Sequence, residues 1–160
     1  LRTGRHRWDV LAVSSVEVGL TYSVIMTITG SLWAKPIWNT WWTWEPRLTS
    51  VTIMLLIYAS YLLLRRMIDE PARRARFAAV YGIAGFISVP ITFMAVRWWR
   101  TIHPVIFESE GFHLTPPMLA VLIVSVIAFS ILYAALLVLR CRLEFTADLV
   151  AELKAGLEDR

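Results

Sequence analysis

Four long runs of apolar residues, almost free of charge, are the feature that most limits how this chain can fold. They cover residues 10–33, 49–64, 77–96 and 118–139. A helix needs about 20 apolar residues to cross the hydrocarbon core of a bilayer, and these runs approach or exceed that length. They lack the alternation of barrel strands, and a helix satisfies its own backbone groups in lipid. The sequence therefore predicts an all-α polytopic membrane protein, a bundle of four transmembrane helices.

The overall composition agrees with a membrane protein and leaves no room for a separate soluble domain. Hydrophobic residues make up 58% of the 160 residues and charged residues 18%, whereas soluble domains average about 25% charged residues. We expect a single transmembrane domain over residues 1–160. The first apolar run is too long for a cleavable signal peptide and leads into further spans. Because the chain begins with leucine, we expect it to lack an N-terminal part.

The distribution of basic residues predicts the orientation of the spans. Of the 16 lysines and arginines, 12 lie in the N-terminal segment, in the connection 65–76 and in the C-terminal segment 140–160. Cytoplasmic connections carry the excess of positive charge. Both termini are therefore expected in the cytoplasm, and the loops 34–48 and 97–117 face outward, into the periplasm of a bacterium with two membranes. This orientation explains the net charge of +4, so no nucleic-acid partner is expected.

Three features go beyond a plain set of spans. Residues 140–160 place apolar side chains at helical spacing among charges, which predicts a cytoplasmic amphipathic helix at the surface or against a partner. Pro90 predicts a kink near the end of the third span. Glu17 lies within the first span, where a carboxylate is costly. The sequence leaves open whether Glu17 is protonated or pairs with a missing helix or a partner subunit.

Tryptophan is concentrated on one predicted face of the membrane, whereas a plain aromatic belt would place it at both interfaces. Seven of the eight tryptophans lie in or beside the outward loops: Trp33, Trp38, Trp41, Trp42, Trp44, Trp98 and Trp99. If residues 36–47 form an interfacial helix or helical turn, the carboxylate of Glu45 and three of these rings share one face: Trp38, Trp41 and Trp42. Such a face suits a large, flat, hydrophobic ligand.

His103 follows Trp99 by four residues on the same predicted side, and imidazole is a common ligand of haem iron. His113 also faces outward but has no aromatic cluster beside it, so it is a minor candidate. Four basic residues either pair with haem propionates or lie at helix ends: Lys35, Arg47, Arg97 and Arg100. The predicted haem-binding residues are Trp38, Trp41, Trp42, Trp44, Glu45, Arg47, Trp98, Trp99 and His103, the last as axial ligand of the iron.

Two segments resemble a known family. Residues 29–50, TGSLWAKPIWNTWWTWEPRLTS, closely resemble the tryptophan-rich WWD signature of CcmC-type cytochrome c biogenesis proteins. WWRTIHP, residues 98–104, is similar to the family's second segment and places His103 on its second flanking histidine. The four spans match the last four of the family's six, so the two N-terminal spans and the first flanking histidine are absent here. Within the signature, Ala34 and Asn39 replace glycines and Glu45 replaces an aspartate.

The resemblance implies a function in cytochrome c maturation. Proteins of this family bind haem b in transit at the outer face of the bacterial cytoplasmic (inner) membrane and load it onto a membrane-tethered chaperone, CcmE. They act in an ABC-type assembly with CcmA- and CcmB-like subunits and a small CcmD-like protein. The resemblance thus implies a transfer component without a catalytic site of its own. Two alternatives stay open: a cytochrome c haem lyase subunit, because Glu45-Pro46 matches the acid-proline pair of those enzymes, and a permease subunit with Glu17 and Pro90 along its path.

Overall fold

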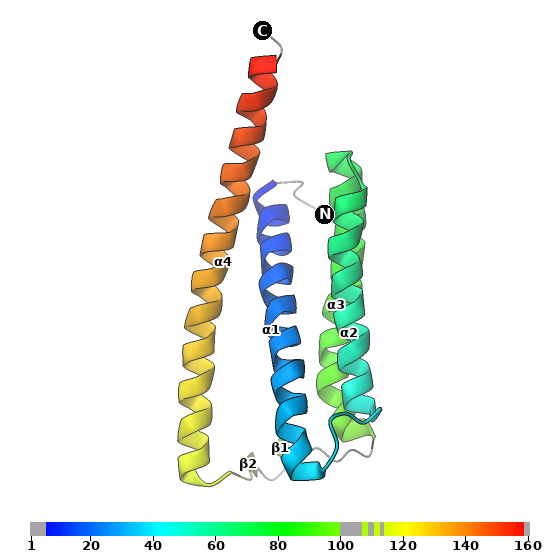
Figure 1. The fold of residues 1–160 in the computed structure, drawn as a ribbon, viewed down its shortest axis with the longest axis vertical. Coiled ribbons are helices and arrows are strands. Elements are labelled where there is room, and N and C mark those ends of the chain that lie inside the picture. The colour runs from blue at the N-terminus through cyan, green and yellow to red at the C-terminus, as the bar shows by residue number, and fades with distance from the viewer. Residues whose placement is uncertain (1–5, 100–106, 109–110, 113, 159–160) are drawn as a thin grey trace. The chain divides into compact units, whose positions relative to one another are not determined.

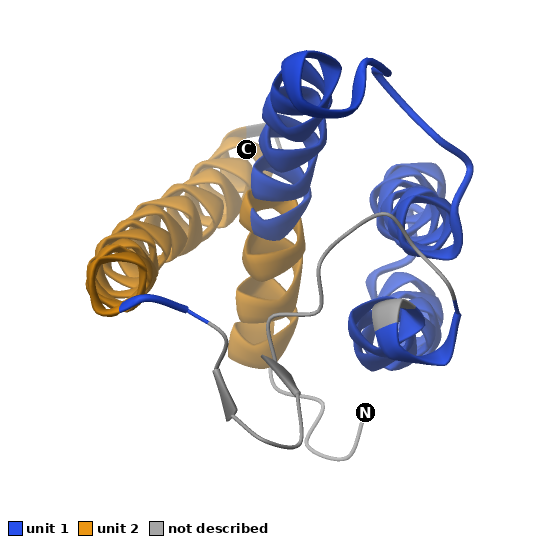
Figure 2. Cartoon of the chain, turned by 90° about the horizontal axis from the view of Figure 1, so that it is seen from below, with its two compact units in different colours: residues 1, 19–115 blue, residues 2–18, 116–160 orange. Residues whose placement is uncertain are grey.

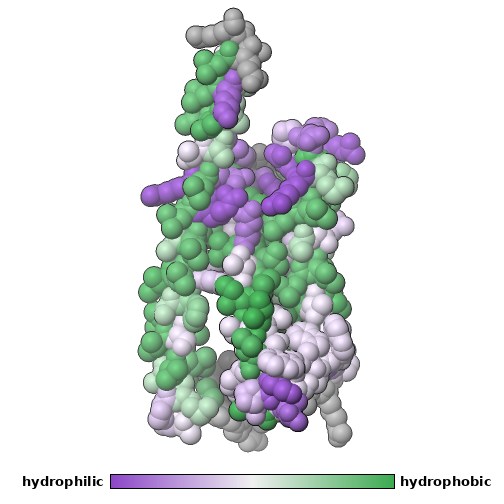
Figure 3. All heavy atoms as spheres, viewed as in Figure 1, coloured by the Kyte–Doolittle hydropathy of each residue, from purple (hydrophilic) through white to green (hydrophobic). Residues whose placement is uncertain are grey.

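The computed structural model describes residues 6–99, 107–108, 111–112 and 114–158. Nearly all of this part of the chain is helical (Figure 1), in four helices: α1 (His6–Trp38), α2 (Pro46–Met67), α3 (Pro71–Trp98) and α4 (Pro116–Glu158). Each helix contains a stretch long and apolar enough to cross a membrane, of which at most 11% is buried. Exposed apolar side chains cover these stretches (Figure 3). The prediction of a four-span, all-helical membrane protein is confirmed.

The helices are longer than the predicted spans, because the hydropathy of a sequence marks the lipid-facing part and not the helix ends. α1 includes residues 34–38 of the predicted first loop, and α3 begins at Pro71. α4 continues without a break through the predicted C-terminal helix. Proline at the first helical position starts both α2 and α3, since its fixed φ suits a helix and its missing N–H costs nothing there.

A short pair of strands is an addition to the predicted architecture. β1 (Phe107–Glu108) and β2 (Gly111–Phe112) pair antiparallel, with Phe107 opposite Phe112. Both lie in the segment between α3 and α4, where the sequence analysis expected only a loop.

The chain forms two compact units (Figure 2). One contains residues 1 and 19–115, and the other contains residues 2–18 and 116–160. α1 therefore contributes to both units: its C-terminal part belongs to the first unit together with α2 and α3, and its N-terminal part belongs to the second unit with α4.

Within the first unit, α2 and α3 form a closely packed antiparallel hairpin (Figure 1). Tyr61 of α2 is only 2% exposed and lies against Gly82, and Tyr58 lies against Gly85. Near the other end of the pair, the Thr92 hydroxyl donates to the backbone oxygen of Ser50 at 3.4 Å. Glycine lets the two tyrosine rings approach the backbone of α3, so the hairpin depends on the absence of a side chain there.

The substitution Gly85→Ala should destabilise this hairpin. A Cβ at this position would lie 2.8 Å from Cε1 of Tyr58 and 3.0 Å from its Cζ, so the ring or the helix must move. Such overpacking costs about 1–3 kcal/mol of unfolding free energy. Gly82→Ala is the matched control, because its nearest atom would be 3.8 Å away, and alanine favours a helix by up to about 1 kcal/mol. Thermal unfolding in detergent, followed by circular dichroism, compares the two; equal effects would contradict this account of the packing.

Candidate functional site

The chain leaves α1 through a sharp reversal at Asn39. This residue has a φ of 56°, in the left-handed region that ends many helices and that asparagine tolerates better than most residues. The ammonium group of Lys35 donates to the Asn39 backbone oxygen at 3.3 Å and to its side-chain oxygen at 3.4 Å. Asparagine is therefore compatible with the turn that this position makes.

The tryptophan segment after this turn is not a helix, so the predicted interfacial helix over residues 36–47 is wrong. Helix α1 ends at Trp38, residues 39–45 are non-helical, and α2 begins at Pro46. The indole rings meet in pairs, edge to face, at centroid distances of 5.1 Å for Trp33 and Trp38 and 5.7 Å for Trp42 and Trp44. The tryptophans still gather in one place, but through a folded loop and not along one helical face.

This loop borders a partly open cavity of about 180 Å³ within the first unit. Its walls come from α1, the loop and the start of α2: Met26, Thr27, Gly30, Ser31, Trp33, Ala34, Trp38, Thr40, Trp41, Trp42, Thr43, Arg47, Leu48 and Val51. Two residues that line the cavity, Trp42 and Thr43, have a polar atom (Nε1 and Oγ1) that is buried without a hydrogen-bond partner in the part of the chain that the structure describes. Buried polar groups normally have a partner, so this site favours a ligand that accepts hydrogen bonds.

The structure brings together some of the predicted site residues and separates others. Trp38, Trp41, Trp42 and Arg47 line the cavity, with Trp41 53% exposed at its edge. Trp44 is 74% exposed and lies outside the wall, and Glu45 precedes α2 as its N-cap residue.

The predicted residues near the end of α3 do not line this cavity. Trp98 and Trp99 are exposed there and contact each other edge to face at 5.8 Å. Arg97 is also exposed, in the last turn of α3. The predicted iron ligand His103, the minor candidate His113 and Arg100 lie outside the described residues.

The sequence analysis missed the contribution of α1 to the site. Met26, Thr27, Gly30, Ser31 and Ala34 form one wall, at the helical spacing that places residues on one face. The hydroxyl of Thr27 donates to the Ser23 backbone oxygen at 2.7 Å, and that of Ser31 donates to Thr27 at 2.9 Å. Because these hydroxyl protons are used within the helix, the wall is largely apolar. The signal that could have found it is the small residues recurring every three or four positions before the tryptophan segment.

The comparison with known proteins places the chain in a family. Residues 4–155 match the family model for heme exporter protein C, CcmC. The chain belongs to the CcmC family. This confirms the resemblance seen in the tryptophan-rich segment, and the match extends over all four helices.

Several relatives of this CcmC-family chain carry the name heme exporter protein C. That of Bradyrhizobium diazoefficiens is 39% identical over 130 residues, which is 80% of this chain and 49% of the relative. That of Escherichia coli K12 is 33% identical over 133 residues, 82% of this chain and 54% of the relative. That of Rhodobacter capsulatus is 32% identical over 147 residues, 89% of this chain and 61% of the relative. The chain thus spans about half the length of the first two.

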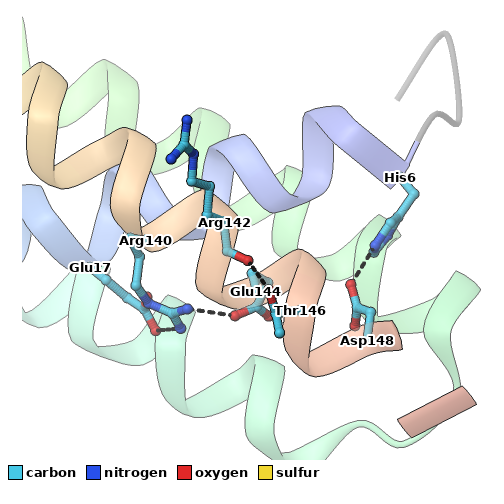
Figure 4. A network of polar contacts seen from close by, with 7 residues as sticks. All are labelled: His6, Glu17, Arg140, Arg142, Glu144, Thr146 and Asp148. Atoms are coloured by element: carbon cyan, nitrogen blue, oxygen red, sulfur yellow. Dashed lines mark hydrogen bonds and ion pairs between the residues drawn. The ribbon is translucent and has the colours of Figure 1, made fainter. Parts of the chain in front are cut away.

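A polar network in the second unit gives Glu17 a partner within this CcmC-family chain (Figure 4). Nε of Arg140 donates to one oxygen of the Glu17 carboxylate at 2.5 Å, and Nη2 donates to the other at 3.1 Å. The third guanidinium nitrogen donates to Glu144 at 2.8 Å. The alternatives that the sequence left open for Glu17 did not include this one: an arginine of the same chain, across from α1 on α4.

Two further contacts join the same helices within the second unit. The imidazole Nε2 of His6 lies 2.8 Å from Oδ2 of Asp148 (Figure 4), and the hydroxyls of Ser15 and Tyr133 lie 2.5 Å apart. Together with the Glu17–Arg140 pair, they hold the N-terminal part of α1 to α4 through polar side chains. Glu17 therefore has an ion-pair partner within the chain.

Proposed function

We propose that this chain binds haem, in transit, at the outer face of the cytoplasmic membrane and passes it to a CcmE-like chaperone for cytochrome c maturation. The observation that carries the proposal is the tryptophan-walled cavity beside the membrane-spanning part of α1. Aromatic walls suit the face of a porphyrin, since they bury a large apolar area. The names of the relatives, heme exporter protein C, point to the same cargo.

The cavity fits one edge of the porphyrin rather than the whole ring. Its volume of about 180 Å³ is below the roughly 300–1,000 Å³ of pockets that enclose a whole small ligand. The groups available in its wall are hydrogen-bond donors: the indole N–H of Trp42, the hydroxyl of Thr43 and the guanidinium of Arg47. An edge bearing carboxylates matches these donors, so we infer that a propionate edge enters and the rest of the ring lies over the exposed Trp41.

Haem b is the form proposed here, as the family resemblance implies. His103 would supply an axial ligand to the iron, and Trp44, Glu45, Trp98 and Trp99 would flank the ring. The chain would act as a binding and transfer component, together with CcmA- and CcmB-like ABC subunits and a CcmD-like membrane protein. Both termini would lie in the cytoplasm, with residues 34–48 and 97–117 at the periplasmic face.

The proposal is tested by adding haem to the detergent-purified chain and titrating the Soret band. Trp42→Ala and His103→Ala should each lower the affinity for haem at least about tenfold, since a tryptophan buries a large area and an axial ligand is lost. Trp8→Ala is the matched control, because Trp8 is an exposed tryptophan of the second unit and should leave the titration unchanged.

Two outcomes would contradict the proposal. One is a titration in which the Trp42 and His103 variants behave as the Trp8 variant does. The other is a topology map, made with cysteine labelling, that places residues 34–48 and 97–117 on opposite sides of the membrane. In that case the tryptophans and the histidine could not share one haem.

A further inference from the structure

Five arginines surround the short connection between α2 and α3, at the end of these helices away from the cavity. Two lie in the last turn of α2 and three in the first turns of α3: Arg65, Arg66, Arg73, Arg74 and Arg76. We call this group the arginine turn. Hydrophilic atoms gather at this end of the hairpin (Figure 3). Because α2 has 22 residues, its rise of 1.5 Å per residue separates the arginine turn from the cavity by about 30 Å.

Two of these guanidinium groups lie over aromatic rings that belong to the apolar part of the hairpin. That of Arg65 lies 5.8 Å from the ring centroid of Tyr61, and that of Arg73 lies 5.9 Å from that of Phe77. Each ring belongs to the neighbouring helical turn on the side of the span. These cation–π contacts place positive charge at the level where an apolar span ends, which is the level of the lipid headgroups.

The three α3 arginines of the turn, Arg73, Arg74 and Arg76, form no ion pair among the residues that the structure describes. The first turn of α3 contains no acidic residue, and its N-cap residue, Glu70, makes no side-chain cap. The positive end of the helix dipole therefore adds to the charge of three arginines instead of opposing it. Asp69 and Glu70 lie in the connection, but within the described part of the chain neither forms an ion pair with one of these three arginines. The orientation of the protein in the membrane depends on how many basic residues a connection carries. It does not explain why three arginines lie at the positive end of the α3 helix dipole.

We propose that the arginine turn binds the phosphate groups of anionic phospholipids in the adjoining leaflet. Guanidinium groups match phosphate oxygens in a two-pronged geometry and carry their charge at every physiological pH. Clusters of four to eight basic residues beside a membrane span attract anionic lipid. The site is separate from the proposed haem cavity and does not depend on it. It requires only that α2 and α3 cross the membrane.

The test uses the whole chain in nanodiscs of phosphatidylcholine, with or without phosphatidylglycerol, and measures bound lipid by native mass spectrometry after mild detergent extraction. The unchanged chain should retain phosphatidylglycerol in preference to phosphatidylcholine. Each arginine of α3 replaced by glutamine should lower this preference about fivefold, so Arg73→Gln/Arg74→Gln/Arg76→Gln should abolish it. The matched control is Arg142→Gln/Lys154→Gln in α4, which removes basic residues elsewhere and should leave the preference intact.

The outcomes separate lipid binding from its alternatives. If the control loses the preference as fully as the arginine-turn variant, or if neither loses it, the proposal is wrong. Inorganic phosphate added to the nanodiscs should not displace the lipid; displacement at the ionic strength of a matched chloride control would show a site for free phosphate instead. If the triple variant does not fold, the unchanged chain still tests the proposal. Equal retention of phosphatidylglycerol and phosphatidylcholine by the unchanged chain would overturn it.

Discussion

Replacing Gly30 with leucine is expected to remove most haem binding while the protein stays folded. Gly30 lines the cavity, and a Cβ built on it meets no atom within 4 Å, so leucine can be accommodated there without a clash and would compete with haem for the space beside it. A haem edge would then have to displace it. Forcing extra atoms into a filled site costs about 1–3 kcal/mol, which lowers the affinity by about fivefold to 150-fold. Titration of the Soret band measures the loss.

Gly19→Leu is the matched control for this experiment. Gly19 also lies on α1, and a Cβ there also meets nothing within 4 Å, but the residue does not line the cavity. Both variants should have the same helix content and the same elution volume. If Gly30→Leu retained haem as tightly as Gly19→Leu, the cavity would not be the place where haem binds, even if the tryptophan variants were impaired.

Glu17→Ala is expected to cause the largest loss of stability. It would leave the Arg140 guanidinium without its two-pronged partner in a partly buried place. Breaking a fully buried ion pair costs about 3–5 kcal/mol. Because the two side chains are 32% and 28% exposed, we expect the lower value for hydrogen bonds to charged groups, about 1.5–3 kcal/mol. Thermal unfolding in detergent is the measurement.

Glu144→Ala provides the comparison, since it removes the other carboxylate that accepts from Arg140. That pair lies within one helix at spacing i, i+4, and such pairs contribute only about 0.3–0.5 kcal/mol. Glu17→Ala should therefore unfold at a clearly lower temperature than Glu144→Ala, with haem titration little changed. A large haem defect with normal stability would return Glu17 to a role in transport.

The four spans could be predicted because each segment that crosses the bilayer must by itself be long and apolar enough to do so. The helix ends could not, since they depend on local events such as Pro46 and Pro71 at the first helical positions. The spacing of Trp38, Trp41 and Trp42 in the sequence is compatible with a helix as well as with the loop that is observed. The left-handed turn at Asn39 decides against it, as does Pro46, which disfavours helical backbone at the residue before it.

The candidate site was predicted in part, for a related reason. Tryptophan is rare and bulky, so its accumulation is visible in the sequence, and the family resemblance is carried by those residues. Gly30 and Ser31 are ordinary small residues of a span, and only the folded loop above them makes them the wall of a cavity. The partner of Glu17 lies 123 residues away along the chain. No local pattern marks such a pair, since it depends on which helices lie side by side.

The unbroken course of α4 has a mechanical consequence. Its 43 residues make a rod of about 65 Å, roughly twice the thickness of the hydrocarbon core. A helix without a hinge moves as one body, so a partner protein that binds its last turns would also change the tilt of its membrane-spanning part. The contacts of Arg140 with Glu17 and of Asp148 with His6, which join α4 to α1, would then be the point about which α4 tilts.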